Sequence, residues 1–408
     1  MPRSNRTAAP EATAAGPAGR SRGPGGQSPP ARALFPRLEH EIYVNAAAGT
    51  PLSSFAEDGL RAYEEYWSLG PGEGRGESIG NMLAETREQI GRLIGATANE
   101  IAFVQCTKHG EQIVLDGLPA LRTGGNVVTN DLHFSGSLHH LVGLRRAGMD
   151  VRIVRSEGWQ TDVAAMAESI DDDTALVSVT LVSNVNGHIE PIRELADIAH
   201  AHGAYVYADI IQAAGIFPVD VTEMGIDFAA GNGYKWLFGA FGTGFLYVRD
   251  ELQGSVLEDR LFPGNARHNY EPWVAEPEPA AGDFVVRPTM SGQRYEPGHQ
   301  AYLCYAALHE GLKFIEDAGV DGLLAHSVSL NQRLYAGLDA NRYTCISPHL
   351  DRSPIITFRP SVDVDLEGAL RAASVVVSVS ADRRIRVSPA VFSNESDIDA
   401  LVAALNGA

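Results

Sequence analysis

Lys235 is the residue of this sequence best placed to do chemistry, and it lies in the run GNGYKWLFGAFGTGFLYV. Glycines, Tyr234 and Trp236 surround it, and an apolar stretch follows. Burying an ammonium group is costly unless the group is neutralised or bonded. A lysine in such surroundings is expected to have a lowered pKa, which makes its amine a nucleophile for Schiff-base chemistry. Read alone, Lys235 is equally compatible with a solvated lysine on a loop.

A carboxylate precedes this lysine by twenty-six residues. Asp209 ends the apolar run AYVYAD, and Gln212 follows three residues later. Read alone, Asp209 could simply cap the next helix. Pyridoxal phosphate (PLP) needs a lysine for C4′, a carboxylate for its pyridine nitrogen, donors for its phosphate and a planar group against its ring. We therefore predict a PLP enzyme in which Lys235 is the Schiff-base lysine and Asp209 is the partner of the pyridine nitrogen.

Seven segments rich in β-branched and apolar residues are expected to position these side chains. They are predicted strands at residues 100–106, 126–130, 150–154, 175–182, 204–209, 227–231 and 244–249. Between two of them, ELADIAHAHG carries apolar residues at helical spacing and stops at Gly203. Nearly continuous apolar strands that alternate with helices indicate an α/β fold with a mostly parallel sheet covered on both faces. Functional side chains are then expected at the carboxyl ends of the strands.

The chain is expected to divide into a tail and two domains. Residues 1–33, rich in Pro, Gly, Ala, Ser and Arg, are predicted to be disordered. Residues 34–285 are predicted to form a large cofactor-binding domain, of which 34–50 could pack with the small domain. Residues 286–408 are predicted to form a small α+β domain of helices, short strands and a closing helix. Its first two helices are expected at 299–318 and 323–338.

The composition limits the partners of this protein. The formal net charge is −19, from 51 acidic and 32 basic residues, so neither nucleic acid nor an anionic membrane surface is expected to bind. No run of about 18 apolar residues occurs, so no membrane span is expected. Cys106, Cys304 and Cys345 are too few and too scattered for a disulfide framework or a zinc site. A reducing, cytoplasmic location fits this cysteine content.

Several motifs follow one another in a fixed order along the chain. They are the SNVNG turn at 183–187, then Asp209, Gln212 and Lys235, and finally Arg-x-Ser at 386–388. In this order they resemble the class V aminotransferase family, and the resemblance runs from YVNAAAGTPLS (43–53) to the end of the chain. That family includes cysteine desulfurases, isopenicillin N epimerase-like enzymes and kynureninases. The resemblance implies the PLP-dependent transferase fold type I, with a large domain built on a mostly parallel mixed sheet and a small C-terminal α+β domain.

The resemblance also implies a role for each matching residue. Lys235 would hold the cofactor and, once displaced by substrate, act as general base and acid at Cα and C4′. Asp209 would hold the pyridinium nitrogen. Gln212 would donate to the phenolic oxygen of the cofactor or to its surroundings, and Asn184 would bond the same oxygen. His133 would stack on the cofactor ring; a loop histidine with a single hydrogen bond is the alternative.

The strand-to-helix turn QCTKHGEQ would receive the phosphate of the cofactor on its free backbone N–H groups. Thr107 would add a hydroxyl there, and His109 belongs to the same turn. Lys108 stands where many relatives have a second hydroxyl residue, so its role is open. Asn232 and Tyr234 occupy positions where desulfurases have a serine and a histidine near the phosphate or the Schiff base. The Tyr-Lys pair is closer to epimerase-like and kynureninase-like members.

Two further segments carry implied roles in the second half of the chain. Arg386 would bind the α-carboxylate of an amino-acid substrate through its guanidinium group, whereas the alternative is a surface arginine on a strand. The run RYEPGHQA matches the segment that family dimers present to the neighbouring active site, so a homodimer is expected. His299 replaces the usual threonine in this run, which leaves its contact with the phosphate open.

One departure from the family narrows the expected reaction. Cysteine desulfurases need a mobile nucleophilic cysteine upstream of the carboxylate-binding arginine, but no cysteine occurs between Ile346 and Arg386. A persulfide mechanism is therefore not expected. Removal of the Cα proton by Lys235 can still lead to β-elimination, transamination or epimerisation, and decarboxylation is another branch.

Among these branches we predict a lyase-type reaction, either C–S β-elimination or decarboxylation. The substrate would be a modified or S-conjugated cysteine in specialised metabolism, because Lys108, Asn232 and His299 depart from housekeeping desulfurases. The alternatives are an aminotransferase or amino-acid epimerase of the class V family, or a family member without catalytic activity. A nucleotide-binding α/β protein is a further alternative, but no Gly-rich dinucleotide or P-loop pattern opens a helix.

Overall fold

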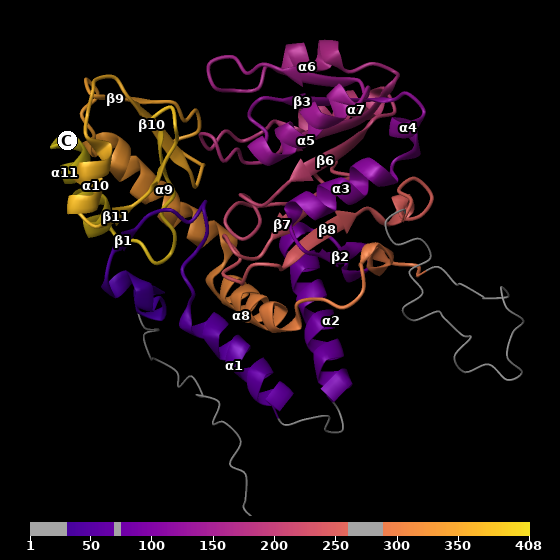
Figure 1. Cartoon of the computed structure of the whole chain (residues 1–408), viewed down its shortest axis with the longest axis horizontal. Coiled ribbons are helices and arrows are strands. Elements are labelled where there is room, and N and C mark those ends of the chain that lie inside the picture. Colours follow the sequence, from indigo (N-terminus) through magenta and orange to yellow (C-terminus); the bar gives the residue numbers. More distant parts are fainter. Residues whose placement is uncertain (1–30, 69–74, 260–288) are drawn as a thin grey trace, which may run out of the picture.

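The structure is a computed structural model that describes residues 31–68, 75–259 and 289–408. Most of the predicted disordered tail therefore lies outside the described residues. Figure 1 shows a large α/β body with long helices in the lower part of the view and a smaller C-terminal part to one side. The predicted architecture, a mostly parallel mixed sheet between helices, is confirmed.

The seven predicted strands form one sheet. Their order is β2-β8-β7-β6-β5-β3-β4, and β8 is the strand that runs antiparallel to its neighbours. The bounds are β2 Ile101–Val104, β3 Asn126–Asn130, β4 Val151–Val154, β5 Thr174–Thr180, β6 Tyr205–Asp209, β7 Phe228–Asn232 and β8 Gly244–Val248. Because β5, β6 and β7 are adjacent and parallel, their carboxyl ends meet at one edge of the sheet.

Most successive side chains of the strands enter different hydrophobic cores on the two faces of the sheet, as the period of two requires. In β5, for example, Leu176 packs into the core that contains Val114 of α3. Its neighbour Val177 packs into the core that contains Leu195 of α7. The near-continuous apolar sequence of the strands follows from this burial on both faces.

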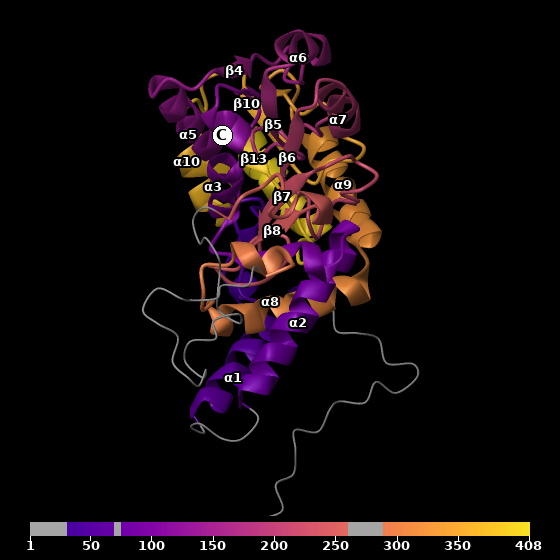
Figure 2. The same cartoon turned by 90° about the vertical axis from the view of Figure 1, so that its right-hand side faces the viewer.

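Helices cover the sheet and form the base of the molecule. Those on and around the sheet are α3 Thr107–Gly117, α4 Pro119–Arg122, α5 Ser135–Arg146, α6 Val163–Ser169 and α7 Ile192–Ala201. Those of the base are α1 Ser54–Ser68, α2 Arg75–Ile94 and α8 Tyr302–Ala318, and α8 packs along both α1 and α2 (Figures 1 and 2). The expected start of α8 at His299 was wrong by three residues: Gln300 and Ala301 precede the first helical turn.

The C-terminal part is built on a four-stranded antiparallel sheet of order β12-β13-β10-β9. Its elements are α9 Val320–Gly337, β9 Tyr343–Cys345, β10 Ile356–Pro360, α10 Leu366–Ala372, β11 Val375–Val376, β12 Ser378–Val379, β13 Ile385–Val387 and α11 Glu395–Asn406. The early strand β1 Ile42–Tyr43 pairs with β11, so the start of the described chain packs against this part. Short 3-10 helices lie at Ala31–Leu34, Pro36–Glu39, Ala98–Glu100, Asp250–Leu252 and Gly292–Tyr295.

Across the described ranges, no helix combines the length and the apolar character that crossing a bilayer requires.

Candidate active site

Asp209 lies at the carboxyl-terminal edge of the sheet, between the ends of two neighbouring strands. It pairs with Thr180 at the end of β5 and with Ala230 on β7. Its side chain is buried, and Oδ1 accepts a hydrogen bond of 3.0 Å from the backbone N–H of Ile211. Burial raises the pKa of this carboxyl, while nearby His133 and Lys235 act in the opposite direction. The carboxyl of Asp209 is therefore a buried hydrogen-bond acceptor that a cationic N–H group could pair with.

Lys235 lies in the loop between β7 and β8, near Asp209. The chain contains three lysines, and Lys235 is the buried one, with 7% of its surface exposed. The side chain of Lys108 is 31% exposed and that of Lys313 is 49% exposed. Burial lowers the pKa of Lys235 to about 8, although Asp209 raises it in part. The sequence alone left open whether Lys235 is buried or solvated. In the structure it is buried.

The lowered pKa predicts how apoprotein should react with added PLP. The neutral amine is the reacting form, so the rate of Schiff-base formation should rise about tenfold per pH unit below pH 8 and level off above it. The absorbance change after mixing apoprotein with PLP, recorded from pH 6 to about 10, measures this rate. A rate that still rises steeply towards the ordinary lysine pKa of 10.5 would contradict the prediction.

Gln212 stands behind the lysine loop and bonds to protein groups at both ends of its amide. Its Oε1 accepts a hydrogen bond of 2.8 Å from Nε1 of Trp236, and its Nε2 donates to the carbonyl of Ala47 at 2.9 Å. The hydroxyl of Thr50 also donates to the carbonyl of Lys235 at 2.9 Å. The sequence predicted that Gln212 donates to the cofactor or to its surroundings; in the structure it donates to Ala47 and accepts from Trp236, the residue that follows Lys235.

The buried ring of His133 is fixed at both nitrogens. The backbone N–H of Phe134 donates to Nδ1 at 2.8 Å, so Nδ1 carries no proton and Nε2 must carry it. Nδ1 also lies 2.5 Å from Oγ1 of Thr180. Nε2 points to Oγ of Ser178 at 3.3 Å and to Oε1 of Glu111 at 3.5 Å. Protein groups thus contact both nitrogens of the imidazole in the plane of the ring. The two faces of the ring are left for a further contact.

Glu111 is a site residue that the sequence reading missed. It is 1% exposed on α3, and Oε2 accepts hydrogen bonds from Nζ of Lys108 at 2.5 Å and from Oγ of Ser137 at 2.8 Å. Burial alone would raise its pKa, but His133 and Lys108 lower it to about 2. The ammonium of Lys108, whose role was open, therefore pairs with a buried carboxylate beside His133.

The start of α3 carries Thr107 and Lys108, which belong to the turn that the sequence predicted at the phosphate. The first N–H groups of a helix have no intrahelical acceptor, which suits this turn to an anion. A side chain at Gly244 would place its Cβ 2.6 Å from the backbone of Cys106, so only glycine lets β8 approach the turn this closely. His109 lies here too; its Nδ1 accepts from the N–H of Gln105 at 3.4 Å, and burial lowers its pKa.

Four predicted site residues carry buried polar atoms that find no hydrogen-bond partner within the described ranges. These atoms are Oγ1 of Thr107, Oδ1 of Asn184, Oδ1 of Asn232 and Nε of Arg386. Buried polar groups in folded proteins are nearly always bonded, so several unbonded ones in predicted site residues point to a polar ligand. Of these atoms, the hydroxyl of Thr107 and the Nε–H of Arg386 are donors, which fit a phosphate and an amino-acid carboxylate.

Tyr234 and His299 complete the predicted set. The ring of Tyr234 stacks on Phe241 at 4.5 Å between centroids, and Nζ of Lys235 lies 5.6 Å from the Tyr234 ring centre. Burial raises the pKa of Tyr234. His299 is exposed before α8, and its Nδ1 lies 2.7 Å from the hydroxyl of Tyr302.

A cleft of about 460 Å³ opens between the large sheet and the C-terminal sheet. His133, Asn184 and Arg386 line it together. Arg386 on β13 is mostly buried and reaches across the cleft: Nη1 donates to the carbonyl of Asn184 at 3.0 Å, and Nη2 donates to Oγ of Ser378 at 2.9 Å. The cleft therefore joins the predicted cofactor residues to the predicted carboxylate-binding arginine.

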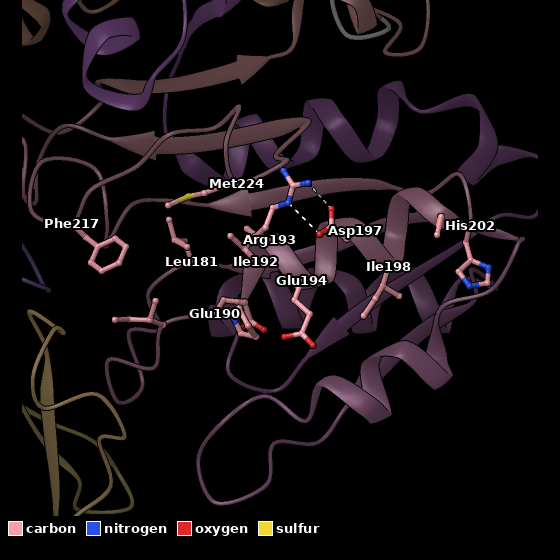
Figure 3. A pocket seen from close by; sticks show the side chains of 13 residues that line it. Leu181, Glu190, Ile192, Arg193, Glu194, Asp197, Ile198, His202, Phe217 and Met224 are labelled. Atoms are coloured by element: carbon pink, nitrogen blue, oxygen red, sulfur yellow. Dashed lines mark hydrogen bonds and ion pairs between the residues drawn. The ribbon is translucent and has the colours of Figure 1, made fainter.

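A second, larger cavity of about 880 Å³ lies over α7, away from these residues (Figure 3). Its walls include Leu181, Phe217 and Met224, and Arg193 and Asp197 form an ion pair of 2.8 Å beside it. None of the predicted site residues lines this cavity.

The three cysteines lie in different parts of the fold. Cys106 precedes α3, Cys304 lies in the first turn of α8, and Cys345 lies on β9. None of them lines the cleft. Burial raises the pKa of the Cys304 and Cys345 thiols, which disfavours the nucleophilic thiolate. Among the described residues, no group of histidine, cysteine or carboxylate side chains could hold a metal ion.

Comparison with known proteins decides the family. The family model described as Aminotransferase class-V matches residues 42–401. The chain belongs to this family. It is therefore a PLP-dependent enzyme of the class V aminotransferases, as the sequence motifs predicted.

Relatives and solved structures agree with this assignment. A "Probable cysteine desulfurase" of Methanothermobacter thermautotrophicus is 29% identical over 306 residues, which cover 74% of this chain and 73% of the relative. The structure of the apo cysteine desulfurase from Thermococcus onnurineus NA1 superposes with a TM-score of 0.79 at 22% identity, over 92% of this chain and 96% of that one. A complex of a cystine C–S lyase with its reaction product cysteine persulfide superposes with a TM-score of 0.76 at 21% identity, over 91% and 99%.

Proposed function

We propose that this class V enzyme is a lyase that cleaves the Cβ–S bond of an S-substituted cysteine. The observation that carries the proposal is a cleft that His133, Asn184 and Arg386 line and whose walls contain no thiol. Several relatives are named cysteine desulfurases, and one similar structure is a cystine C–S lyase, so carbon–sulfur cleavage is common among the proteins this chain resembles. A sulfur atom that leaves with its own substituent needs no enzyme thiol to receive it.

We assign the cofactor contacts as follows. Asp209 would bind the pyridine nitrogen, and His133 would present a ring face to the pyridine. The amide N–H of Asn184 would donate to the phenolic oxygen, and the hydroxyl of Thr107 would donate to the phosphate. Asn232 and the turn at the start of α3 would complete the phosphate site. Bound PLP would supply an electron sink for negative charge at Cα.

Arg386 and Lys235 then carry out substrate binding and proton transfer. Arg386 binds the α-carboxylate and orients the substrate, which favours retention of that carboxylate over decarboxylation. The amine of Lys235 removes the Cα proton, because burial lowers its pKa to about 8 and keeps part of it neutral near pH 7. The Cβ–S electrons leave with sulfur, which takes up a proton to become a thiol. The remaining aminoacrylate adds water and yields pyruvate and ammonium.

The assembly and the location of the enzyme are proposals of the same kind. We propose a homodimer, which is supported by an exposed apolar hollow that Trp67 of α1 and Leu303 of α8 line together. Phe241, which stacks on Tyr234 next to the lysine, is 74% exposed and would also be covered by a second subunit. A cytoplasmic location, suggested by the cysteine content, stays a prediction.

The proposed reaction is tested by analysing products from a panel of amino acids. The PLP-loaded enzyme is incubated with S-alkyl cysteines, cysteine and alanine, without any keto-acid acceptor. We expect thiol, pyruvate and ammonium in equal amounts from the S-alkyl cysteines. Carbon dioxide, a D-amino acid, or turnover only after a keto acid is added would instead identify decarboxylation, epimerisation or transamination. Each of those results would contradict the proposal.

A further inference from the structure

A second arginine lines the same cleft, two residues before the one assigned to the α-carboxylate. Arg384 immediately precedes β13, Arg386 is the middle residue of that strand, and both side chains line the cleft. The strand rise places their Cα atoms roughly 7 Å apart. The cleft wall thus presents two guanidinium groups in one row.

The guanidinium of Arg384 contacts Asp382 and Trp159, and its two terminal nitrogens are available as hydrogen-bond donors. Its Nε donates to Oδ1 of Asp382 at 2.9 Å, which is its one side-chain hydrogen bond with the described part of the chain. Its Cζ lies 5.7 Å from the ring centre of Trp159. The two terminal nitrogens make no hydrogen bond to those described ranges, and 23% of the side chain is exposed. The carboxylate-binding edge of this arginine is therefore free within the cleft.

Trp159 is held in place at a conformational cost. Its φ is +67°, a left-handed conformation that bulky residues rarely adopt and that is found at functional sites. The buried amide of Asn186 holds this turn, because its Nδ2 donates to the carbonyl of Trp159 at 2.9 Å and to that of Ile346 at 3.1 Å. Arg359 approaches the same ring at 5.6 Å. The indole therefore bridges the large body and two arginines of the C-terminal part.

The charged residues around Arg384 and Trp159 favour the binding of an anion. Asp382 also accepts from Arg359 at 3.3 Å, so one carboxylate is shared by two guanidinium groups. The other acidic residue of the cleft, Asp131, accepts from the N–H of Ser156 at 2.8 Å and lies 3.4 Å from Arg155. Asp382 pairs with Arg384 through Nε, at 2.8 Å from Oδ2, and within the described ranges neither carboxylate bonds to the two terminal nitrogens.

We propose that Arg384, backed by Trp159, binds a second carboxylate, at the far end of the substrate side chain. The substrate class is then an S-conjugated cysteine whose sulfur substituent ends in a carboxylate, such as an S-carboxyalkyl cysteine. In such a molecule the two carboxylates lie at a separation comparable to that of the two arginines. The inference rests on the proposed role of Arg386 and deepens the proposed function of the same cleft.

The test compares two substrates that differ only in the charge of the distal group. S-(2-carboxyethyl)-L-cysteine and its carboxamide, S-(2-carbamoylethyl)-L-cysteine, are given to the PLP-loaded enzyme and to its Arg384→Gln variant. We expect the enzyme to prefer the carboxylate by about tenfold or more in kcat/KM, as a hydrogen-bonded charge pair implies. Arg384→Gln should bring that ratio close to one and leave kcat/KM for the carboxamide within about threefold. Arg371→Gln, which removes an exposed guanidinium on α10, should keep the preference.

Two results would overturn the inference: equal turnover of both substrates by the enzyme, or an unchanged preference in the Arg384→Gln variant. If neither compound is cleaved, the proposed reaction fails but the subsite is still measured. In that case the change in cofactor absorbance on adding each compound gives its dissociation constant. Binding that favours the carboxylate by about tenfold, and that loses this preference in Arg384→Gln, would support the subsite. Equal dissociation constants would refute it.

Discussion

The Lys235→Ala variant is expected to lose at least about 10³-fold in kcat with S-substituted cysteines. It should also lose the absorption band of PLP bound as a Schiff base, because neither of the other two lysines is buried near Asp209. The comparison is made by steady-state kinetics and by absorption spectra of the loaded proteins. Thermal unfolding of the apoproteins should be little changed, since the loss of a buried, partly neutral amine removes no hydrogen bond seen in the described residues.

Lys313→Ala provides the matched control for this experiment. Lys313 lies on α8 and pairs with Glu310 at 2.8 Å on the surface. Removing it should leave both kcat and the absorption band within error of the unsubstituted enzyme. A Lys235→Ala protein that kept its band and its turnover would show that another group carries out the proton transfer.

The Asp209→Asn variant is expected to have the second largest effect. The amide preserves the shape of the buried side chain, but its loss of charge removes the partner that keeps a pyridine nitrogen protonated. We expect kcat to fall by about 10²-fold or more, the size found when one electrostatic contact to developing charge is removed. PLP should also bind more weakly. Kinetics at saturating PLP and a titration of the apoprotein with PLP separate the two effects.

Folding provides the control for Asp209→Asn. Burial already raises the pKa of this carboxyl, so replacing it with a neutral amide should not lower the free energy of unfolding of the apoprotein appreciably. Asp172→Asn, at an exposed carboxylate, should leave every measured quantity unchanged. An Asp209→Asn enzyme with full kcat would exclude a role for this carboxylate at the cofactor.

Much of the large sheet could be predicted from the sequence. Strands that are buried on both faces consist almost entirely of apolar residues, and such runs are visible in the sequence. The segment 126–130 was expected as a strand and forms one with the same bounds, and Asp209 was expected at a strand end and lies there. The start of α8 was less predictable. Nothing in the local sequence shows that His299 contacts the hydroxyl of Tyr302 ahead of the first turn.

The parts of the site that escaped the sequence reading depend on contacts between distant segments. Glu111 looks like the partner of Lys108 in an exposed i,i+3 pair, and its burial follows only from the packing of His133 and Ser137 against it. Trp159 gives no sequence signal either. Its position depends on the amide of Asn186 and on arginines of the C-terminal part.

The central claim is that Lys235 binds the cofactor, and the small number of lysines makes one measurement decisive. The purified protein is loaded with PLP, reduced with borohydride and digested, and the pyridoxyl group is located by mass spectrometry. With three lysines in the chain, the label can lie at Lys108, Lys235 or Lys313. We expect near-complete labelling of the peptide that contains Lys235. A label at Lys108 or Lys313, or no label at all, would contradict it.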